Sequence, residues 1–230
     1  MKNTIKALFV NILACILLPV SSLGQSVDGA YVNNGKTVVV DKKVHQILTT
    51  NSSEVLYFSN ELITKIYTNS DFTVNTLFQE VLNKNTTPEK AKFGSHNFAA
   101  TLMNGTATVV YSGGDTNTSS CTISTPMVDV ELSKGVFYFD VTEKKVIIAI
   151  LEGSMKYYNG KKENPLVAGQ AVIAEPSDVG ILENKISISP GKVNSDAMKK
   201  LTASSKELVN LKGTVMFARI DGKLVGIVID

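Results

Sequence analysis

The amino-acid sequence predicts an all-β fold, a β-sandwich or a compact β-roll, with one short C-terminal helix and a terminal hairpin. Three observations lead to this prediction. From Thr37 onward, short runs of Val, Ile, Thr, Tyr and Phe alternate with clusters of Gly, Asn, Ser and Asp, a spacing typical of all-β domains. Between residues 194 and 210 the apolar residues instead recur with a helical period. Two further apolar runs flank Asp221-Gly222, a dipeptide that favours a hairpin turn.

The first 24 residues have the pattern of a cleaved secretory signal peptide. Lys2 and Lys6 make a positive start, an apolar run covers residues 7–20, and small residues over Ser22–Gly24 suit a signal peptidase. The apolar run is shorter than the roughly 20 residues that a membrane-spanning helix needs. We therefore expect an exported protein, periplasmic or extracellular, with no stable membrane span after the signal is cleaved.

The chain has two cysteines, Cys15 and Cys121. Cys15 allows an alternative to signal cleavage, because Ile12–Cys15 resembles a bacterial lipobox and a lipid on Cys15 would anchor the mature protein. If Cys15 leaves with the signal, Cys121 has no partner for an internal disulfide, and the core alone must hold the fold together. Cys121 is then a reactive thiol, a bridge to another chain, or a small residue where a loop meets a strand. We favour the last, because neither histidine is close in the sequence.

Length and composition favour one globular domain. The chain has 230 residues, of which 43% are hydrophobic and 19% are charged, as in an ordinary globular protein. Its 23 basic and 21 acidic residues give a formal net charge of +2 and form no basic block. Because nucleic-acid binding depends on such a block, nucleic acid is not expected as a partner.

The order of the elements divides the chain after the signal into three parts. Residues 25–45 are an N-terminal entry segment, 46–175 the main β domain, and 176–230 the helix and the closing hairpin. The runs expected to form strands are Thr37–Val40, Glu54–Ser59, Glu61–Thr68, Asp71–Phe78, Asn97–Met103, Ala107–Ser112, Met127–Leu132, Val136–Val141, Lys145–Glu152, Ser154–Asn159 and Ala171–Glu175.

The segment around Leu77 fits either a strand or a helix. Alternation up to Phe78 suits a strand, whereas Leu77 and Val81 would share one face of a helix. We favour a strand that continues to about Glu80, followed by a polar loop containing Pro88.

Two later apolar patterns define a central strand and a helix. The run Val146–Leu151 is apolar on both faces, which predicts a strand lying deep between layers. Leu201 and Leu208 lie at helical spacing, and Asn194 or Ser195 is placed to cap the start of that helix. The hairpin after the helix is expected to close a sheet edge or to pair with the N-terminal strand.

Five segments, in this order, carry a family resemblance: "TNSSEVLYFSNELITKIYTNSDFTVN", "MNGTATVVYSG", "CTISTPMVDVELSKGVFYFDV", "VIIAILEGSMKYYNG" and "PLVAGQAVIA". Over about Gln46–Glu175 the chain resembles the FecR family of bacterial extracytoplasmic domains. The resemblance implies a FecR-like β domain at 46–175, outside the cytoplasm, with no catalytic residues to carry over. The best-known members relay a surface signal to a cytoplasmic sigma factor through an N-terminal inner segment. Because this chain opens with a signal peptide, we expect a stand-alone exported member instead.

One departure from the family pattern lies at Gly135. Family members usually have Gly-Thr before the aromatic strand, whereas here Val136 follows Gly135 and the phenylalanines are one place out of phase. A β-bulge or a register change at Gly135 is expected to absorb the difference.

No catalytic, cofactor-binding or metal-ligating residue is predicted, and no cofactor is expected. His45 and His96 lie far apart in the sequence without a nearby Cys or paired acidic motif, so we expect both to be surface or loop residues. Asp129 and Glu131 should project from one face of a strand. On an exposed sheet face, two such carboxylates are expected to be solvated, not to act as a general acid and base.

Three glycines and two tyrosines are the remaining candidates for functional residues. Gly153 and the pair Gly113-Gly114 have no phosphate-binding pattern around them and are interpreted as turns. Tyr157 and Tyr158 should point to opposite faces of their strand, one packed inward and one exposed and free to contact a sugar or a peptide.

These observations favour a non-catalytic, exported binding or signal-associated module of the bacterial cell envelope that recruits an unidentified protein or glycan partner. The alternative is a structural component of the envelope or matrix, and an enzyme is not expected. Exposed sheet edges would favour recruitment of a partner by strand addition.

Overall fold

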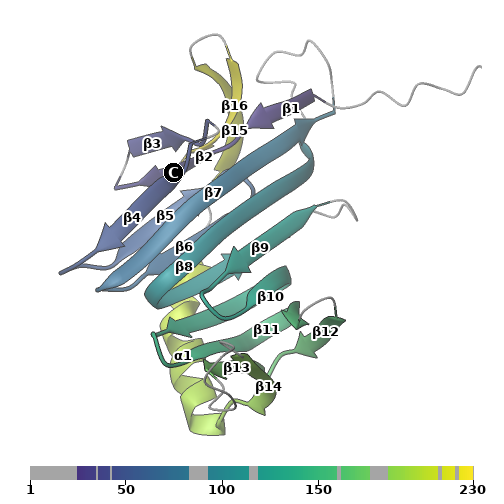
Figure 1. The fold of residues 1–230 in the computed structure, drawn as a ribbon. Helices are drawn as coiled ribbons and strands as arrows, with labels where there is room; N and C mark the ends of the chain where they lie inside the picture. The colour runs from purple at the N-terminus through teal and green to yellow at the C-terminus, as the bar shows by residue number, and fades with distance from the viewer. Residues whose placement is uncertain are drawn as a thin grey trace, which may run out of the picture.

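The computed structural model describes residues 25–34, 36–41, 43–82, 93–113, 119–159, 162–176, 186–211, 214–220 and 223–229. In these residues the chain forms sixteen strands of one continuous sheet and one α-helix (Figure 1). The predicted all-β fold with a short C-terminal helix and a terminal hairpin is confirmed. The predicted signal peptide and the predicted loop at Pro88 lie outside the described residues.

The strands are β1 (Gln25–Asp28), β2 (Ala30–Asn33), β3 (Lys36–Val39), β4 (His45–Thr49), β5 (Glu54–Phe58), β6 (Leu62–Ile66), β7 (Ser70–Val81), β8 (Phe93–Tyr111), β9 (Ser120–Ser124), β10 (Asp129–Val141), β11 (Val146–Asn159), β12 (Lys162–Val167), β13 (Gln170–Pro176), β14 (Ile186–Lys192), β15 (Thr214–Ile220) and β16 (Lys223–Ile229), and the helix is α1 (Ser195–Val209).

The sheet is folded into two layers that face each other across the core. Layer A has the strand order β4, β7, β8, β9, β10, β11, β12, with β1 beside β4 on the same edge of β7. Layer B has the order β3, β2, β5, β6, β8, β10, β11, β13, β14. Three long strands, β8, β10 and β11, belong to both layers, because their two halves pair with different neighbours.

A glycine lies where each shared strand passes from one layer to the other: Gly105 in β8, Gly135 in β10 and Gly153 in β11. At Gly153 the φ angle is 82°, and an added Cβ would lie 1.9 Å from the carbonyl oxygen of Lys134. At Gly135 an added Cβ would lie 2.2 Å from the carbonyl oxygen of Glu152. The two backbones therefore approach each other so closely that only glycine fits at these corners.

The corners lie at opposite ends of layer B. In the ladder between β8 and β10, Gly135 is opposite Tyr111, whereas Gly105 is opposite Val141. Strand β8 thus changes layer at one end, and β10 and β11 change layer at the other.

From the sequence, each of the three shared strands was predicted as two separate strands with a break between them. This prediction was wrong. Residues Asn97–Met103 and Ala107–Ser112 are parts of one strand, β8, that bends at Gly105. The prediction that Gly153 forms a turn was wrong in the same way, because Gly153 lies inside β11. The expected irregularity at Gly135 is confirmed, since the register between β10 and β11 shifts on both sides of it.

The core between the layers is aliphatic and aromatic. Its largest fully buried side chains are Phe58, Phe72, Phe98, Phe137, Phe139, Leu56, Leu62, Ile66, Leu77, Leu102, Ile123 and Ile148. Strand β11 pairs with β10 on one side and β13 on the other, and Val146, Ile148 and Ile150 are fully buried. The prediction of a central strand here is confirmed. Burying each such side chain contributes about 1.5–3 kcal/mol.

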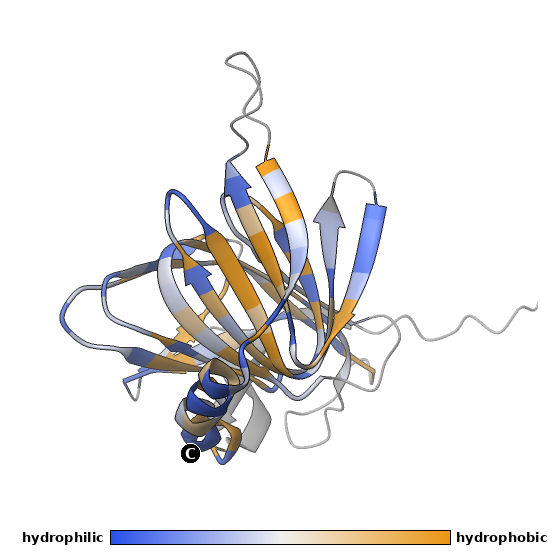
Figure 2. Ribbon diagram, turned by 90° about the horizontal axis from the view of Figure 1, so that it is seen from below, coloured by the Kyte–Doolittle hydropathy of each residue, from blue (hydrophilic) through white to orange (hydrophobic). Residues whose placement is uncertain are grey.

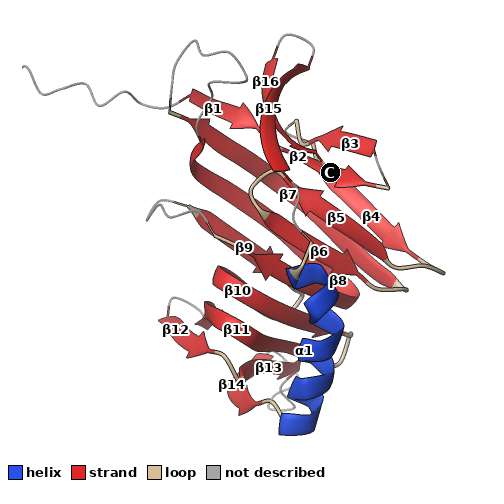
Figure 3. Cartoon of the chain, turned by 180° about the vertical axis from the view of Figure 1, so that it is seen from behind, coloured by secondary structure: helices blue, strands red, loops and turns tan. Residues whose placement is uncertain are grey.

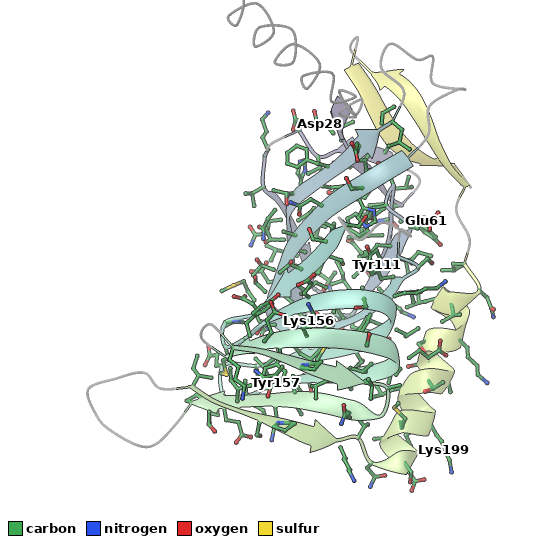
Figure 4. The ribbon with its side chains drawn as sticks, turned by 90° about the vertical axis from the view of Figure 1, so that its right-hand side faces the viewer. Asp28, Glu61, Tyr111, Lys156, Tyr157 and Lys199 are labelled. Atoms are coloured by element: carbon green, nitrogen blue, oxygen red, sulfur yellow. The ribbon has the colours of Figure 1, made fainter. Side chains whose placement is uncertain are left out.

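Helix α1 lies across the outer side of layer B, over β8, β10 and β11 (Figure 3). Leu208 of the helix packs with Val110, Val136 and Leu151 in a second apolar cluster. The side chain of Asn194 accepts a hydrogen bond from the backbone N–H of Asp196 at 2.8 Å, so Asn194 is the N-cap, as predicted. The outer side of the helix is hydrophilic (Figure 2), and Lys199 points away from the sheet there (Figure 4).

Strands β15 and β16 form the predicted antiparallel hairpin, although its Asp221-Gly222 turn lies outside the described residues. Strand β16 runs parallel to β1, with Asp28 opposite Val225. Of the two expected roles for the hairpin, pairing with the N-terminal strand is the one observed. Strand β7 extends to Val81, which confirms the predicted strand to about Glu80.

Candidate functional site

The outer side of layer A is a broad polar surface, which we call the open face. It is formed by the outward-pointing side chains of β4 and β7 to β11, namely Gln46, Asp71, Thr73, Asn75, Thr101, Thr122, Ser124, Asp129, Glu131, Lys156 and Tyr158. These side chains are partly or fully exposed. They point outward because residues in a strand alternate between its two faces, and their neighbours in sequence fill the core.

Glu131 and Tyr158 meet on the open face. The Tyr158 hydroxyl donates a hydrogen bond of 2.6 Å to Oε2 of Glu131 across the β10–β11 ladder. This bond to a carboxylate favours the protonated phenol and raises the pKa of Tyr158 to about 12. Its neighbour Tyr157 is buried, so the prediction that the two tyrosines face opposite ways is confirmed. Asp129 is exposed and Glu131 is held by Tyr158, so the two predicted carboxylates have different environments.

Charged side chains lie at both ends of the open face. Nζ of Lys156 is 3.1 Å from Oε2 of Glu163 on the edge strand β12, and this hydrogen bond raises the pKa of Lys156. At the other end, Nε2 of Gln46 donates to both carboxylate oxygens of Asp71, at 3.0 and 3.1 Å. Between these ends, strands β7, β8 and β9 carry the hydroxyl and amide groups of Thr73, Asn75, Thr101, Thr122 and Ser124, which bind partners by hydrogen bonds rather than by charge.

The open face ends at β4, where apolar side chains are exposed. Leu48 is 61% exposed, and Val44, directly before the strand, is 68% exposed. Met103 on β8 is 50% exposed, close to the Gly105 corner. Asp71 on β7 pairs with Leu48 on one side and with Asn104, the residue after Met103, on the other. Leu48 and Met103 therefore lie on either side of Asp71.

A second group of polar side chains lies inside the molecule, between the layers. Nε2 of His96 and the hydroxyl of Tyr111 are 2.5 Å apart, and Nε2 of Gln79 donates to the carbonyl of Ser59 at 2.7 Å. Gln79 and His96 are opposite each other in layer A, and both reach across to layer B. Both bonds therefore join the two layers at the end where the β5–β6 turn lies. In Figure 4, Tyr111 lies beside Glu61 of that turn.

Asn60 lies in the same turn and is buried, and neither Nδ2 nor Oδ1 of its side chain has a hydrogen-bond partner; Oε1 of Gln79 has none either. Burial also lowers the pKa of His96, because a charged imidazole would lose its hydration inside the core. The expectation that His96 is a surface or loop residue was wrong. The alternation of His96 with Phe98, both on the inner face of β8, was the signal in the sequence that places it inside.

The remaining predicted residues are not brought together. His45 on β4 and His96 on β8 are separated by β7. Cys121 is fully buried in β9 and belongs to the core, where burial raises the pKa of its thiol. Cys121 is the second residue of β9, so it lies at the start of a strand, as the sequence suggested, but its side chain belongs to the core. Gly113 follows the end of β8 with a φ of 70°, and Gly114 lies outside the described residues.

Within the described ranges, no group of three or more His, Cys, Asp and Glu side chains is arranged to hold a metal ion. No helix in that part of the chain has the length and apolar composition needed to cross a membrane.

In comparisons with known proteins, this chain is similar to solved structures but to no family model and to no curated protein. Two crystal structures, both described as a "putative anti-sigma factor" from Parabacteroides distasonis, are similar to this chain, with TM-scores of 0.45 and 0.40. Each is 7% identical to it in sequence, and each match covers 80% of this chain and 98% of the other.

Proposed function

We propose that this chain is a non-catalytic, exported binding module of the bacterial cell envelope, of the FecR type, that recruits a protein partner through the open face. The observation that carries the proposal is the asymmetry of the two layers. Layer B is covered by α1 on its outer side, whereas layer A presents exposed hydroxyl, amide and charged groups across strands β4 to β11.

The FecR kinship rests on the five sequence segments and on one structural detail. A register shift at Gly135 is what a FecR-like chain needs if Val136 follows that glycine, and the β10–β11 ladder has such a shift. A signal-associated role for this chain is part of the proposal and rests on the same kinship.

The titratable residues of the fold support a binding role. Glu131 is engaged by Tyr158, the Cys121 thiol is enclosed in the core, and His96 is bonded to Tyr111. Each of these three groups is held by the fold, either through a hydrogen bond to a tyrosine or by enclosure in the core.

A protein partner is favoured over a glycan by the composition of the face. Glycan sites commonly use well-exposed aromatic rings as platforms, whereas Phe78 and Tyr158, outward aromatic side chains of layer A, are only partly exposed. The broad polar face bordered by Leu48 and Met103 instead resembles a protein interface, with an apolar part beside a hydrogen-bonding part.

The test is a pull-down from an envelope extract with the wild-type chain and two variants. Thr122→Arg places a long charged side chain at the centre of the open face and should abolish capture of a stoichiometric partner. Lys199→Glu alters the far side of α1 and should leave capture unchanged. Capture that survives Thr122→Arg, with both variants melting like the wild type, would refute the role of the open face. Release of the bound material by free oligosaccharide would point to a glycan instead.

A structural role in the envelope or matrix is the second candidate, because β4 presents an exposed sheet edge. It predicts that the purified protein assembles into particles much larger than a dimer at low concentration. Sedimentation velocity distinguishes this from a binding module that stays small.

A further inference from the structure

The edge of layer A at β4 differs from the sheet edges at β12 and β14. Within the described part of the chain, β4 pairs only with β7, so the backbone groups along its second edge are open to another strand. Strand β4 contains no proline, glycine, lysine or acidic residue. Such an edge is a ready template for pairing.

Two other edges are protected in the ways that proteins commonly use. Strand β12 carries Pro165 and begins with Lys162, and β14 carries Pro190 and ends with Lys192. Proline removes a backbone donor, and an edge lysine would be desolvated by a pairing strand. The contrast indicates that β4 is not protected against pairing.

The exposed apolar residues of this edge are self-complementary. Gln46 and Leu48 of β4 and Val44, the residue directly before it, have the same parity along the chain, and all three are exposed. The pairing described next extends the strand by this one residue. In an antiparallel pair of two β4 strands centred on Gln46, each Leu48 lies opposite the partner's Val44. In the next register, centred on Ile47, each Leu48 would instead lie opposite the partner's Gln46. The first register alone removes both exposed apolar side chains from water.

We propose that two copies of this chain form a symmetric dimer in which their β4 strands pair antiparallel with Gln46 at the two-fold axis. Charge does not oppose this arrangement, because Lys43 lies opposite the partner's Thr49 and no two like charges face each other over residues 43–49. Layer A then continues from one copy into the other as one sheet, with both open faces on the same side. The inference concerns the strand edge and goes beyond the partner proposed for the open face.

The interface is tested by charge substitution at the two apolar positions. The double variant Val44→Lys/Leu48→Lys places two facing lysine pairs across the axis and should raise the dimer dissociation constant at least about tenfold. The matched variant Val44→Glu/Leu48→Lys places a lysine opposite a glutamate at the same two positions and should restore dimerisation. Sedimentation equilibrium over a concentration series measures both.

The register is tested by disulfide trapping in a Cys15→Ser background, in which Cys121 is enclosed in the core. Gln46→Cys brings two thiols together at the axis, because directly opposite residues of an antiparallel pair have Cα atoms about 4.5–5.5 Å apart, within disulfide reach. This variant should form a covalent dimer on oxidation. Leu48→Cys, whose thiols lie apart on either side of the axis, should not.

Several outcomes would overturn the proposal. A wild-type chain that stays monomeric at every concentration excludes the dimer, and loss of dimerisation in Val44→Glu/Leu48→Lys excludes this register. Faster cross-linking of Leu48→Cys than of Gln46→Cys also contradicts it. Assemblies larger than a dimer contradict the closed two-fold symmetry. Partner capture is scored separately with Thr122→Arg, so failure of the dimer and failure of the open face are distinguishable.

Discussion

At the scale of single residues, the buried imidazole of His96, which is bonded to Tyr111, is expected to make stability depend on pH. The imidazole is buried, and its pKa is lowered from the ordinary value of 6.5. Because the unfolded chain binds a proton at His96 more readily than the folded chain does, acid favours unfolding.

We expect the free energy of unfolding to be independent of His96 above about pH 6.5 and to fall below it, by up to about 1.4 kcal/mol per pH unit, until the lowered pKa is reached. Urea denaturation between pH 7.5 and pH 5 measures this slope. His96→Gln, which keeps a hydrogen-bonding group near Tyr111, should flatten the slope. An unchanged slope in His96→Gln would contradict the assignment.

Glu61 is held in an unfavourable backbone conformation. Its φ angle is 60°, in the left-handed region, although its side chain is exposed and it is not a glycine. Glu61→Gly should stabilise the protein by roughly 0.5–1 kcal/mol, because glycine adopts this conformation without the steric cost. Asn69 has a φ of 56°, and asparagine tolerates it better, so Asn69→Gly should gain less. Thermal melting compares the two variants, and equal gains would argue against backbone strain at Glu61.

At the scale of elements, the corner glycines are the positions on which the long strands depend. Gly153→Ala should destabilise the protein by more than about 3 kcal/mol, because the new Cβ meets the Lys134 carbonyl and the backbone has positive φ. Gly169 provides the control, since its φ of 84° is similar but no atom lies within 4 Å of an added Cβ. Gly169→Ala should cost only about 1–2 kcal/mol. Similar midpoints for the two variants in urea would contradict the close approach at the corner.

Several elements could be predicted from the sequence, because each of their residue patterns fits only one type of secondary structure. The period of Leu201 and Leu208 and the cap at Asn194 identify α1, and the apolar run Val146–Leu151 identifies a strand paired on both sides. The corners could not be predicted, because a glycine marks a tight turn and a bend within a strand equally well. What distinguishes a bend from a turn here is the close approach of Gly135 to Gly153. That contact joins two different strands and is not visible in the sequence around either glycine.

The candidate sites were less predictable than the fold. The contact between Glu131 and Tyr158 depends on the register of β10 against β11, which is shifted at Gly135 and so cannot be counted from the sequence. The burial of Cys121 was missed for a different reason. Its strand, β9, is mostly polar and was not among the runs expected to form strands, although Cys121 and Ile123 alternate as inward residues should.

At the scale of the whole molecule, α1 covers layer B without contributing to the core between the layers. Leu208→Asp should release the helix, because it places a charge in the apolar cluster with Val110 and Val136. Limited proteolysis should then cut within α1 while the strands stay protected and far-ultraviolet circular dichroism keeps its β signature. Lys199→Gln, on the exposed side, is the control. Complete unfolding of Leu208→Asp would show instead that the helix is required for the sheet to fold.

The chain passes between the layers at both ends, through Gly105 at one and through Gly135 and Gly153 at the other. Layers A and B are therefore connected by continuous backbone at both ends and cannot separate from each other as two independent sheets. We expect loss of structure to begin at the outermost strands and to move inward. Amide protons of β3 and β14 should exchange with solvent first, and those in the middle of β8 and β10 should exchange last.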